Sequence, residues 1–215
     1  MVNFFLTEGM AMKREEKNQQ TRRRILDSAL MEFAQRGYGG SSVNTICAAQ
    51  GVSKGIIYHY FDGKDALYLS CVEECFRLLT EHLQSRIPAG DAPAQRQLED
   101  YFACRMDFFR SHPVYQPIFC EAVVNPPTHL QEEIQARRQG FDQLNAAILE
   151  GMLKPLPLRR GIARADVVEV LRQLQDFINA RYRVTPMSPE EFRARDESCR
   201  RALDILLYGI VKRTE

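Results

Sequence analysis

Residues 21–72 read TRRRILDSALMEFAQRGYGGSSVNTICAAQGVSKGIIYHYFDGKDALYLSCV, and this stretch decides the fold. Apolar side chains recur at intervals of three and four over residues 19–35, which predicts an amphipathic helix. The glycine-rich segment 37–40 is expected to end this helix, because glycine accepts the left-handed backbone that helix ends favour. No alternation of apolar and polar residues is sustained in the chain, so we expect no strands.

Two short helices are predicted next. Ser42 suits the N-cap of a helix over 43–50, and Gly51 suits its left-handed end. Ser53 suits the N-cap of a third helix over 54–60. Two short helices joined by a glycine-containing turn, after a longer helix, are typical of a helix-turn-helix that reads the DNA major groove. The residues expected to pack its core are Ile46, Ala49, Val52, Ile56 and Ile57.

The third helix carries side chains that suit DNA recognition. Lys54, Tyr58, His59 and Tyr60 offer hydrogen-bond donors and aromatic faces. Gly55 lacks a side chain, which would let the start of this helix approach the DNA backbone closely. The two tyrosines also suit a core, and His59 equally suits a solvated surface. We favour DNA contact for the tyrosines because a short basic helix offers little core.

Charge is distributed unevenly along the chain. The 215 residues include 29 Lys and Arg and 28 Asp and Glu, a net charge of +1. Residues 17–60 hold six basic and two acidic residues, a net charge of +4, whereas residues 61–215 hold 21 basic and 23 acidic residues. The basic segment is therefore expected to face an anion. Its run Arg22, Arg23 and Arg24 also suits a merely solvated helix face.

The rest of the chain is expected to be helical, which makes the fold class all-α. We expect an N-terminal flexible tail over 1–16, a DNA-binding domain over 17–63 with its motif at 42–61, and an effector-binding and dimerisation domain over 64–215. Ser188 suits the N-cap of the last helix. The helices predicted in the third part cover residues 64–87, 94–111, 114–124, 128–154, 165–182 and 189–214.

The sequence patterns that mark many enzymes are missing. There is no glycine-rich phosphate loop and no His-Glu-x-x-His, and the four histidines are scattered. We therefore expect no catalytic activity, no cofactor and no metal. No apolar run approaches the roughly 18 residues of a membrane helix. Six cysteines without Cys-x-x-Cys spacing, and no secretory signal, favour reduced thiols and a cytoplasmic location.

Residues 21–72 resemble the TetR family of bacterial transcriptional regulators. The matching residues are Arg23, Ile25, Leu26, Phe33, Ala34, Gly37, Tyr38, Ser42, Val43, Ile46, Cys47, Ala48, Ala49, Gly51, Val52, Ser53, Lys54, Gly55, Tyr58, Tyr60, Phe61, Lys64 and Leu67. The resemblance implies a three-helix DNA-binding head, a homodimer on a near-palindromic operator, and a divergent helical body that binds a small molecule and releases DNA. It also places Lys64 where the family has a phosphate-contacting lysine. The predicted DNA-binding residues are Ser42, Val43, Asn44, Thr45, Ser53, Lys54, Gly55, Tyr58, His59, Tyr60 and Lys64.

Residues 98–125 are the most aromatic part of the body and a candidate effector site, although such a cluster is also typical of an ordinary core. Arg105 lies between two phenylalanines on one helix face, where a charge needs a partner. Glu121 is one candidate partner and an anionic ligand is another. Gly140 would permit a close approach or a cavity wall. The candidate ligand-binding residues are Phe102, Arg105, Phe109, Tyr115, Phe119 and Glu121.

The last two predicted helices carry apolar stripes with spacings of three, four and seven, which suit packing against other helices. In the resembled family these two helices form a four-helix bundle between subunits, whereas the alternative is an ordinary core face. The candidate dimer-interface residues are Val170, Leu174, Phe177, Leu203, Leu206 and Ile210.

Cys71, Cys75 and His82 share a face of the helix predicted over 64–87. They suit a soft-metal or redox sensor, or an apolar stripe. We favour the stripe, because free cysteine is among the most buried residue types. The leading hypothesis is thus a homodimeric repressor released from its operator by a small hydrophobic or aromatic effector. The alternatives are a thiol- or metal-responsive regulator and a ligand-independent DNA-binding protein.

Overall fold

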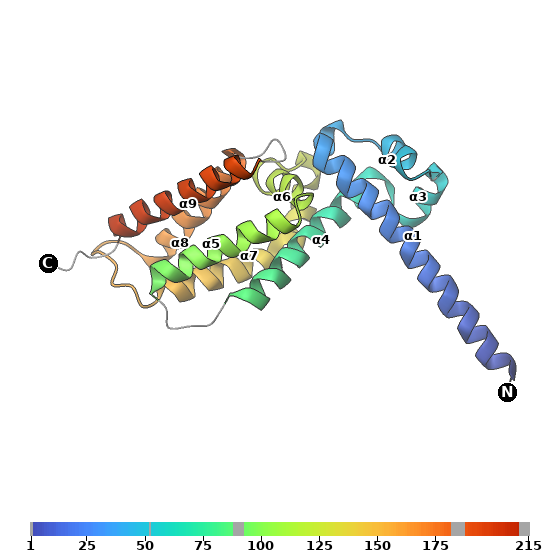
Figure 1. Cartoon of the computed structure of the whole chain (residues 1–215), viewed down its shortest axis with the longest axis horizontal. Coiled ribbons are helices and arrows are strands. Elements are labelled where there is room, and N and C mark those ends of the chain that lie inside the picture. Colours follow the sequence, from blue (N-terminus) through green and yellow to red (C-terminus); the bar gives the residue numbers. More distant parts are fainter. Residues whose placement is uncertain (1, 52, 88–92, 182–187, 211–215) are drawn as a thin grey trace. The chain divides into compact units, whose positions relative to one another are not determined.

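The computed structural model describes residues 2–51, 53–87, 93–181 and 188–210, and every regular element among them is helical (Figure 1). The all-α fold class is therefore confirmed. The elements are α1 (Val2–Gly40), α2 (Val43–Gln50), α3 (Lys54–Tyr60), α4 (Gly63–Arg86), α5 (Ala94–Ser111), α6 (Tyr115–Val124), the 3-10 turn η1 (Thr128–Leu130), α7 (Gln131–Leu153), α8 (Arg164–Arg181) and α9 (Pro189–Ile210).

The chain forms two compact units, Met1–Cys71 and Val72–Glu215. The division lies inside α4, whereas the boundary expected after residue 63 coincides with the start of that helix. The first unit is the head of the molecule and the second is its body.

The first helix of the head is longer than expected. The tail predicted over residues 1–16 is instead a continuation of α1, which begins at Val2. Residues 10–17, MAMKREEK, are all strong helix formers, and this propensity favours the longer helix. Gly37 interrupts α1 with φ 66° and ψ 175°, so the glycine-rich segment breaks the regular helix as predicted.

Local side-chain caps define α2 and α3. The Ser42 hydroxyl accepts a hydrogen bond from the Thr45 amide at 3.1 Å, and Thr45 Oγ1 accepts one from the Ser42 amide at 3.3 Å. This reciprocal pair is a capping box. Gly51 ends α2 with φ 62°, and Ser53 caps α3 by accepting from the Ile56 amide. All three end signals were predicted correctly.

The core of the head is built mainly from α1, with one buried isoleucine from each short helix, Ile46 and Ile57. Two residues expected in this core are exposed: Ala49 and Ile56, the latter by 41%. Ile56 lies about 100° around the helix from Ile57, and a helix of only seven residues turns one narrow face inward. Val52 lies outside the described residues.

The helices of the body largely match their predicted ranges. α5 has the predicted bounds, and η1 replaces the first turn of the helix predicted over 128–154. Ser188 caps α9: the Glu191 amide donates to Ser188 Oγ at 3.2 Å, and Glu191 Oε2 accepts from the Ser188 amide at 2.7 Å. Residues 211–214, the end of the last predicted helix, lie outside the described residues.

Within the body, α5 packs against α7 and α9, and α8 contacts α6, α7 and α9, as Figure 1 shows for the paired α8 and α9. Gly140 does not line a close helix contact: it is exposed, and a Cβ added there would meet no atom within 4 Å. The close-approach hypothesis for Gly140 is therefore wrong, because the residue lies on the outer face of α7. In the part of the chain that is described, no helix combines the length and the hydropathy needed to cross a membrane.

Candidate nucleic-acid interface

α3 presents almost its whole surface to solvent, because Ile57 is its single buried residue. Tyr58 is 50% exposed, so it is not a core aromatic. The Lys54 ammonium lies 6.0 Å from the centre of the Tyr58 ring, which places a cation beside an exposed aromatic face. A Cβ added to Gly55 would meet only Ser53 Oγ, at an ordinary 3.9 Å, so the fold itself does not require glycine at this position.

The C-terminal turn of α3 is tied to α1. The Tyr60 hydroxyl donates to Asn18 Oδ1 at 3.1 Å, and Tyr60 is half-buried. The exposed His59 ring packs edge-on against Tyr60, with ring centres 5.1 Å apart. Tyr60 therefore positions α3, while Tyr58 and His59 remain accessible.

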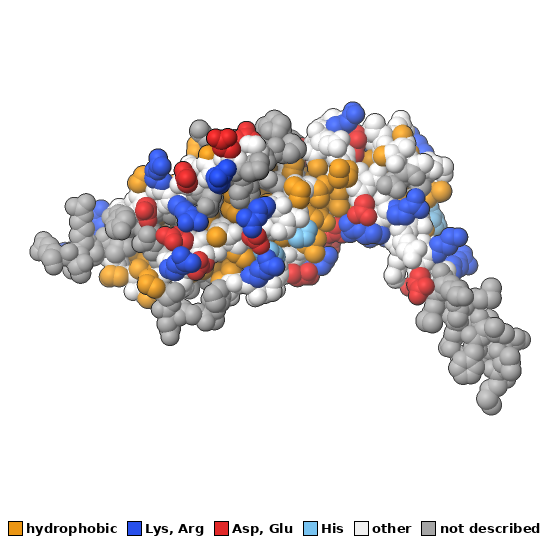
Figure 2. Space-filling model, in the orientation of Figure 1, with side chains coloured by type: hydrophobic (Ala, Val, Ile, Leu, Met, Phe, Trp, Pro, Cys, Tyr) orange, Lys and Arg blue, Asp and Glu red, His pale blue; other side chains and the backbone are white. Residues whose placement is uncertain are grey.

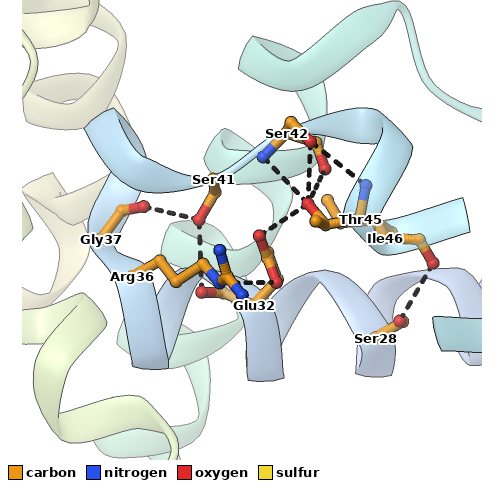
Figure 3. Close-up of polar contacts among 8 residues, drawn as sticks. All are labelled: Ser28, Glu32, Arg36, Gly37, Ser41, Ser42, Thr45 and Ile46. Carbon is orange, nitrogen blue, oxygen red and sulfur yellow. Dashed lines mark hydrogen bonds and ion pairs between the residues drawn. The ribbon is translucent and has the colours of Figure 1, made fainter. Parts of the chain in front are cut away.

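A polar network fixes the start of α2 on α1 (Figure 3). Thr45 Oγ1 lies 2.7 Å from Glu32 Oε1, and Arg36 Nε lies 3.6 Å from Glu32 Oε2. The Ser41 hydroxyl donates to the Gly37 carbonyl at 2.6 Å, and the buried Ser28 hydroxyl donates to the Ile46 carbonyl at 3.3 Å. These bonds hold the short helix in one orientation.

The four residues at the start of α2 that were predicted to contact DNA differ in their exposure to solvent. Val43 is buried, Ser42 and Thr45 are half-buried and bonded to each other, and Asn44 is exposed. Asn44 is thus the member of this group whose side chain is most available to a partner.

Lys64 is held at the start of α4 by an aromatic neighbour. Its ammonium lies 4.1 Å from the centre of the Tyr38 ring. The Tyr38 hydroxyl donates to the Asp65 carboxylate, and burial together with this bond raises the pKa of Tyr38 to about 12. Tyr38 therefore stays protonated and neutral at physiological pH, and Lys64 keeps a defined position on the head.

The three consecutive arginines of α1 are exposed but not equivalent. Arg23 forms an ion pair with Asp27 one turn away, whereas the Arg22 guanidinium lies 4.8 Å from the centre of the Phe61 ring. Figure 2 shows several basic side chains on the head and a mixture of basic and acidic side chains on the body. The pairing of Arg23 supports the solvated-face interpretation for that residue.

Five of the six residues predicted to bind an effector are buried in the body, whereas Glu121 is half-buried. Phe102, Phe109, Tyr115 and Phe119 are buried, and Arg105 is buried among them. The rings of Phe109 and Phe119 lie 5.2 Å apart, and Arg105 Cζ lies 5.5 Å from the centre of Phe119. The Tyr115 hydroxyl donates to the Glu74 carboxylate, so that hydroxyl is already engaged.

Two members of this cluster, Phe141 and Asn145, were not found from the sequence, and Tyr101, which lies in the aromatic stretch 98–125, was not among the six predicted ligand-binding residues. Tyr101, Phe141 and Asn145 are buried and contact Arg105 directly or through one hydrogen bond. Tyr101 precedes Arg105 by one helical turn, so spacing could have found it. Phe141 and Asn145 lie on α7, and no local pattern relates them to α5.

Residues 25–71 match the family model described as bacterial regulatory proteins, tetR family. The match covers part of the head and none of the body. The HTH-type transcriptional repressor DhaR of Mycobacterium sp. (strain GP1) is 34% identical over 82 residues, which cover 38% of this chain and 41% of DhaR. The HTH-type transcriptional regulator RutR of Escherichia coli (strain K12) is 23% identical over 142 residues, 66% of each protein. These relatives are transcription regulators, not enzymes.

Solved structures of transcriptional regulators share the fold. The regulator FadR of Bacillus subtilis in complex with stearoyl-CoA has a TM-score of 0.69 at 20% identity, over 87% of this chain and 98% of FadR. A tetR-family regulator of Chloroflexus aurantiacus has a TM-score of 0.68 at 23% identity, over 91% of this chain and 95% of that protein. At these identities, the likeness establishes the all-helical architecture.

The body exposes apolar side chains on its last two helices. Val170 and Phe177 of α8 are 46% and 63% exposed, and Ile205 of α9, which was not predicted, is 70% exposed. The predicted Leu174 and Leu206 are half-buried, whereas the side chains of Leu203 and Ile210 lie outside the described residues. Two other residues of the α8 stripe, Val167 and Leu171, are buried in the body. The apolar stripe of α8 therefore lies partly in the core of the body and partly on its surface.

The thiols of the chain lie apart from any metal-binding group among the described residues. Cys71 and Cys75 are fully buried, and the Cys75 thiol lies 3.7 Å from the Tyr115 carbonyl oxygen. His82 Nε2 lies 3.1 Å from the Cys104 carbonyl oxygen. Among the described residues, no group of three His, Cys, Asp or Glu side chains is arranged to hold a metal ion. These placements favour the apolar-stripe interpretation.

Proposed function

We propose that the protein is a homodimeric transcriptional repressor that binds a near-palindromic operator and is released by a small hydrophobic or aromatic effector. The observation that carries the proposal is the exposed surface of α3, with Lys54, Gly55, Tyr58 and His59, on a three-helix scaffold fixed by buried contacts. A short helix of this kind fits the major groove, where its side chains meet base edges and phosphates.

The exposed apolar residues of α8 and α9 supply the support for a homodimer. A large apolar side chain such as Phe177 in contact with water is costly, and burying it against a second copy removes that cost. A two-fold dimer presents two α3 helices to half-sites about one DNA turn, or ~34 Å, apart. Any effector that prefers a conformation with another spacing then weakens DNA binding, typically by a coupling free energy of about 1–3 kcal/mol.

The repressor mode and the apolar effector are supported by the relatives. DhaR carries the name of a repressor, and the FadR neighbour was solved with stearoyl-CoA, a ligand with a long apolar chain. In this chain, the aromatic cluster around Arg105 is the corresponding candidate site, and its six predicted members remain proposals. A cytoplasmic location follows from this function.

The variant Gly55→Ala tests the DNA-binding surface. The added methyl group meets no close atom of the protein, so folding should be unaffected or slightly improved. If α3 approaches DNA as proposed, the methyl group separates the helix from the DNA backbone and operator affinity falls about tenfold or more, roughly 1.4 kcal/mol. Fluorescence anisotropy on an operator fragment selected from genomic DNA measures this effect.

The matched control is Gly140→Ala, the same change at an exposed position of the body. It should leave operator affinity unchanged. Wild-type affinity in Gly55→Ala would contradict a close approach of α3 to DNA.

A further inference from the structure

Arg105 is a cation in the apolar interior of the body. It is 5% exposed, and its guanidinium carbon lies 5.7, 5.5 and 5.2 Å from the ring centres of Tyr101, Phe119 and Phe141. These rings come from three helices, α5, α6 and α7. Their negative faces attract the guanidinium, but rings do not neutralise a buried positive charge.

The polar partners of Arg105 are neutral. Nη1 donates to the Tyr101 hydroxyl at 2.9 Å, and that hydroxyl donates in turn to Asn145 Oδ1. No carboxylate among the described residues forms an ion pair with Arg105, so Glu121 is not the partner that the sequence suggested. The charge thus lacks a counter-ion within the described part of the fold.

Arg138 provides a direct comparison inside the same body. Its guanidinium also lies over an aromatic ring, 5.9 Å from the centre of Phe76, but it pairs with both oxygens of Asp142 at 2.9 and 3.0 Å. An acid one helical turn away is therefore available to this arginine. The residues one turn from Arg105 are Tyr101 and Phe109, neither of which carries a negative charge.

The guanidinium of Arg105 also has donors to spare. It carries five N–H groups, and its hydrogen bonding within the described residues is the single bond to Tyr101. Among the described residues, Gln116 Nε2 is the one side-chain nitrogen that is fully buried without a hydrogen-bond partner. The remaining nitrogens of Arg105 are therefore not fully buried. These donors therefore keep some accessible surface, as a group that receives a ligand requires.

We propose that Arg105 anchors the carboxylate of the effector, so that the ligand is a hydrophobic or aromatic monocarboxylate. A guanidinium binds a carboxylate through two parallel hydrogen bonds, which would supply the missing counter-ion. One unpaired positive charge matches one negative charge, which favours a monoanion over a phosphate dianion. The surrounding phenylalanine rings match an apolar ligand body. This inference deepens the proposed function and depends on it only for the effect of the ligand on DNA.

Binding of benzoate and decanoate to the full-length protein tests the proposal, with benzamide and decanol as neutral counterparts. Isothermal titration calorimetry and thermal unfolding report binding. At least one carboxylate should bind saturably and raise the Tm, and its neutral counterpart should bind at least tenfold more weakly. Failure of both carboxylates to bind, or equal binding of the neutral counterpart, would overturn the proposal. This comparison needs no variant.

Two substitutions locate the anchor. Arg105→Met should weaken carboxylate binding at least tenfold, whereas Arg138→Met should leave it unchanged. Without ligand, Arg105→Met should keep or raise the Tm because it removes an unpaired buried charge, whereas Arg138→Met should lower it because Asp142 loses its partner. Unchanged carboxylate affinity in Arg105→Met, or a lower Tm in Arg105→Met than in Arg138→Met, would assign Arg105 to the core instead.

Genomic DNA selection by the unliganded protein separates this inference from the proposed function. Carboxylate binding through Arg105 without any selected DNA would support the inference and reject the repressor. Selection of specific DNA by a protein that does not bind the carboxylates would support the repressor and reject the inference.

Discussion

Thr45 shows how a single side chain can fix the orientation of a short helix in the head. Its hydroxyl oxygen lies 2.7 Å from Glu32 Oε1 and also accepts the Ser42 amide, so it joins α1 to the cap of α2. We predict that Thr45→Val, which keeps the shape but removes the hydroxyl, lowers the free energy of unfolding by about 1–2 kcal/mol, because a half-buried carboxylate loses a donor. Urea denaturation followed by circular dichroism measures it.

The control for this prediction is Asn44→Ala on the same short helix. Asn44 is exposed, so its loss should change stability by less than about 0.5 kcal/mol. If Thr45→Val proved as stable as the wild type, the bridge between Glu32 and α2 would carry no net stabilisation.

At the residue scale, the sequence predicted hydrogen bonds between residues that are close together along the chain and missed those between residues that are far apart. The caps at Ser42, Ser53 and Ser188 depend on groups three residues away, and all three are confirmed. Glu32 and Thr45 are 13 positions apart, and Tyr101 and Asn145 are 44 apart. Such pairs form only after helices pack, so spacing along the chain does not reveal them.

At the scale of elements, two glycines with opposite roles make a matched pair. Gly51 ends α2 with φ 62°, whereas Gly140 lies in the middle of α7 with open space around its Cβ position. We predict that Gly51→Ala destabilises the head by about 1 kcal/mol because alanine is strained in the left-handed region. Gly140→Ala should stabilise the body by roughly 0.4–1 kcal/mol, because it restricts the unfolded chain. Denaturation midpoints of both variants check the signs, and equal shifts would refute the assigned backbone roles.

The contact between α4 and α5 contains a histidine that prefers to be neutral. Burial, followed by the nearby Arg86, lowers the pKa of His82 below its ordinary value of 6.5, although Asp107 and the Cys104 carbonyl act in the opposite direction. The unfolded chain therefore takes up a proton more readily than the folded one below about pH 6.5. The contribution of neutral His82 to the free energy of unfolding is therefore present above about pH 6.5. It is lost as the pH falls toward the pKa that His82 has in the folded protein.

We predict that His82→Gln makes stability less dependent on pH between about 7 and 5. Thermal unfolding across this range compares the variant with the wild type. Parallel stability curves for the two proteins would show that His82 does not titrate differently in the folded state.

Helix existence was predictable, whereas helix ends and faces were only partly so. Proline and glycine punctuation located α5 and α6 to within one residue. The length of α1 was not predicted, because chain termini are commonly irregular, whereas the helix propensity of residues 10–17 extends this helix toward the N-terminus. The exposure of Ile56 was missed because the apolar pattern of a seven-residue helix does not identify which of two adjacent isoleucines faces inward.

At the scale of the whole molecule, the proposed dimer depends on the exposed apolar residues of α8 and α9. We predict that Phe177→Glu weakens self-association at least tenfold, because a charge replaces an apolar side chain that is 63% exposed in one copy. Sedimentation equilibrium measures the change. Met31→Glu, at an exposed position of α1, is the control and should leave the oligomeric state unchanged.

Operator affinity should fall together with dimerisation in Phe177→Glu, because two heads on one dimer bind adjacent half-sites as a unit. A variant that remains dimeric, or that becomes monomeric yet binds its operator as the wild type does, would contradict this arrangement.

The most direct test of the central claim is selection of genomic fragments by the full-length, unliganded protein at physiological salt. A homodimeric repressor should enrich a few fragments that share a near-palindromic element with half-sites about one helical turn apart, bound ~10³-fold or more tightly than random DNA. Binding that falls steeply with salt but enriches no sequence would contradict it, because that behaviour reports phosphate attraction alone.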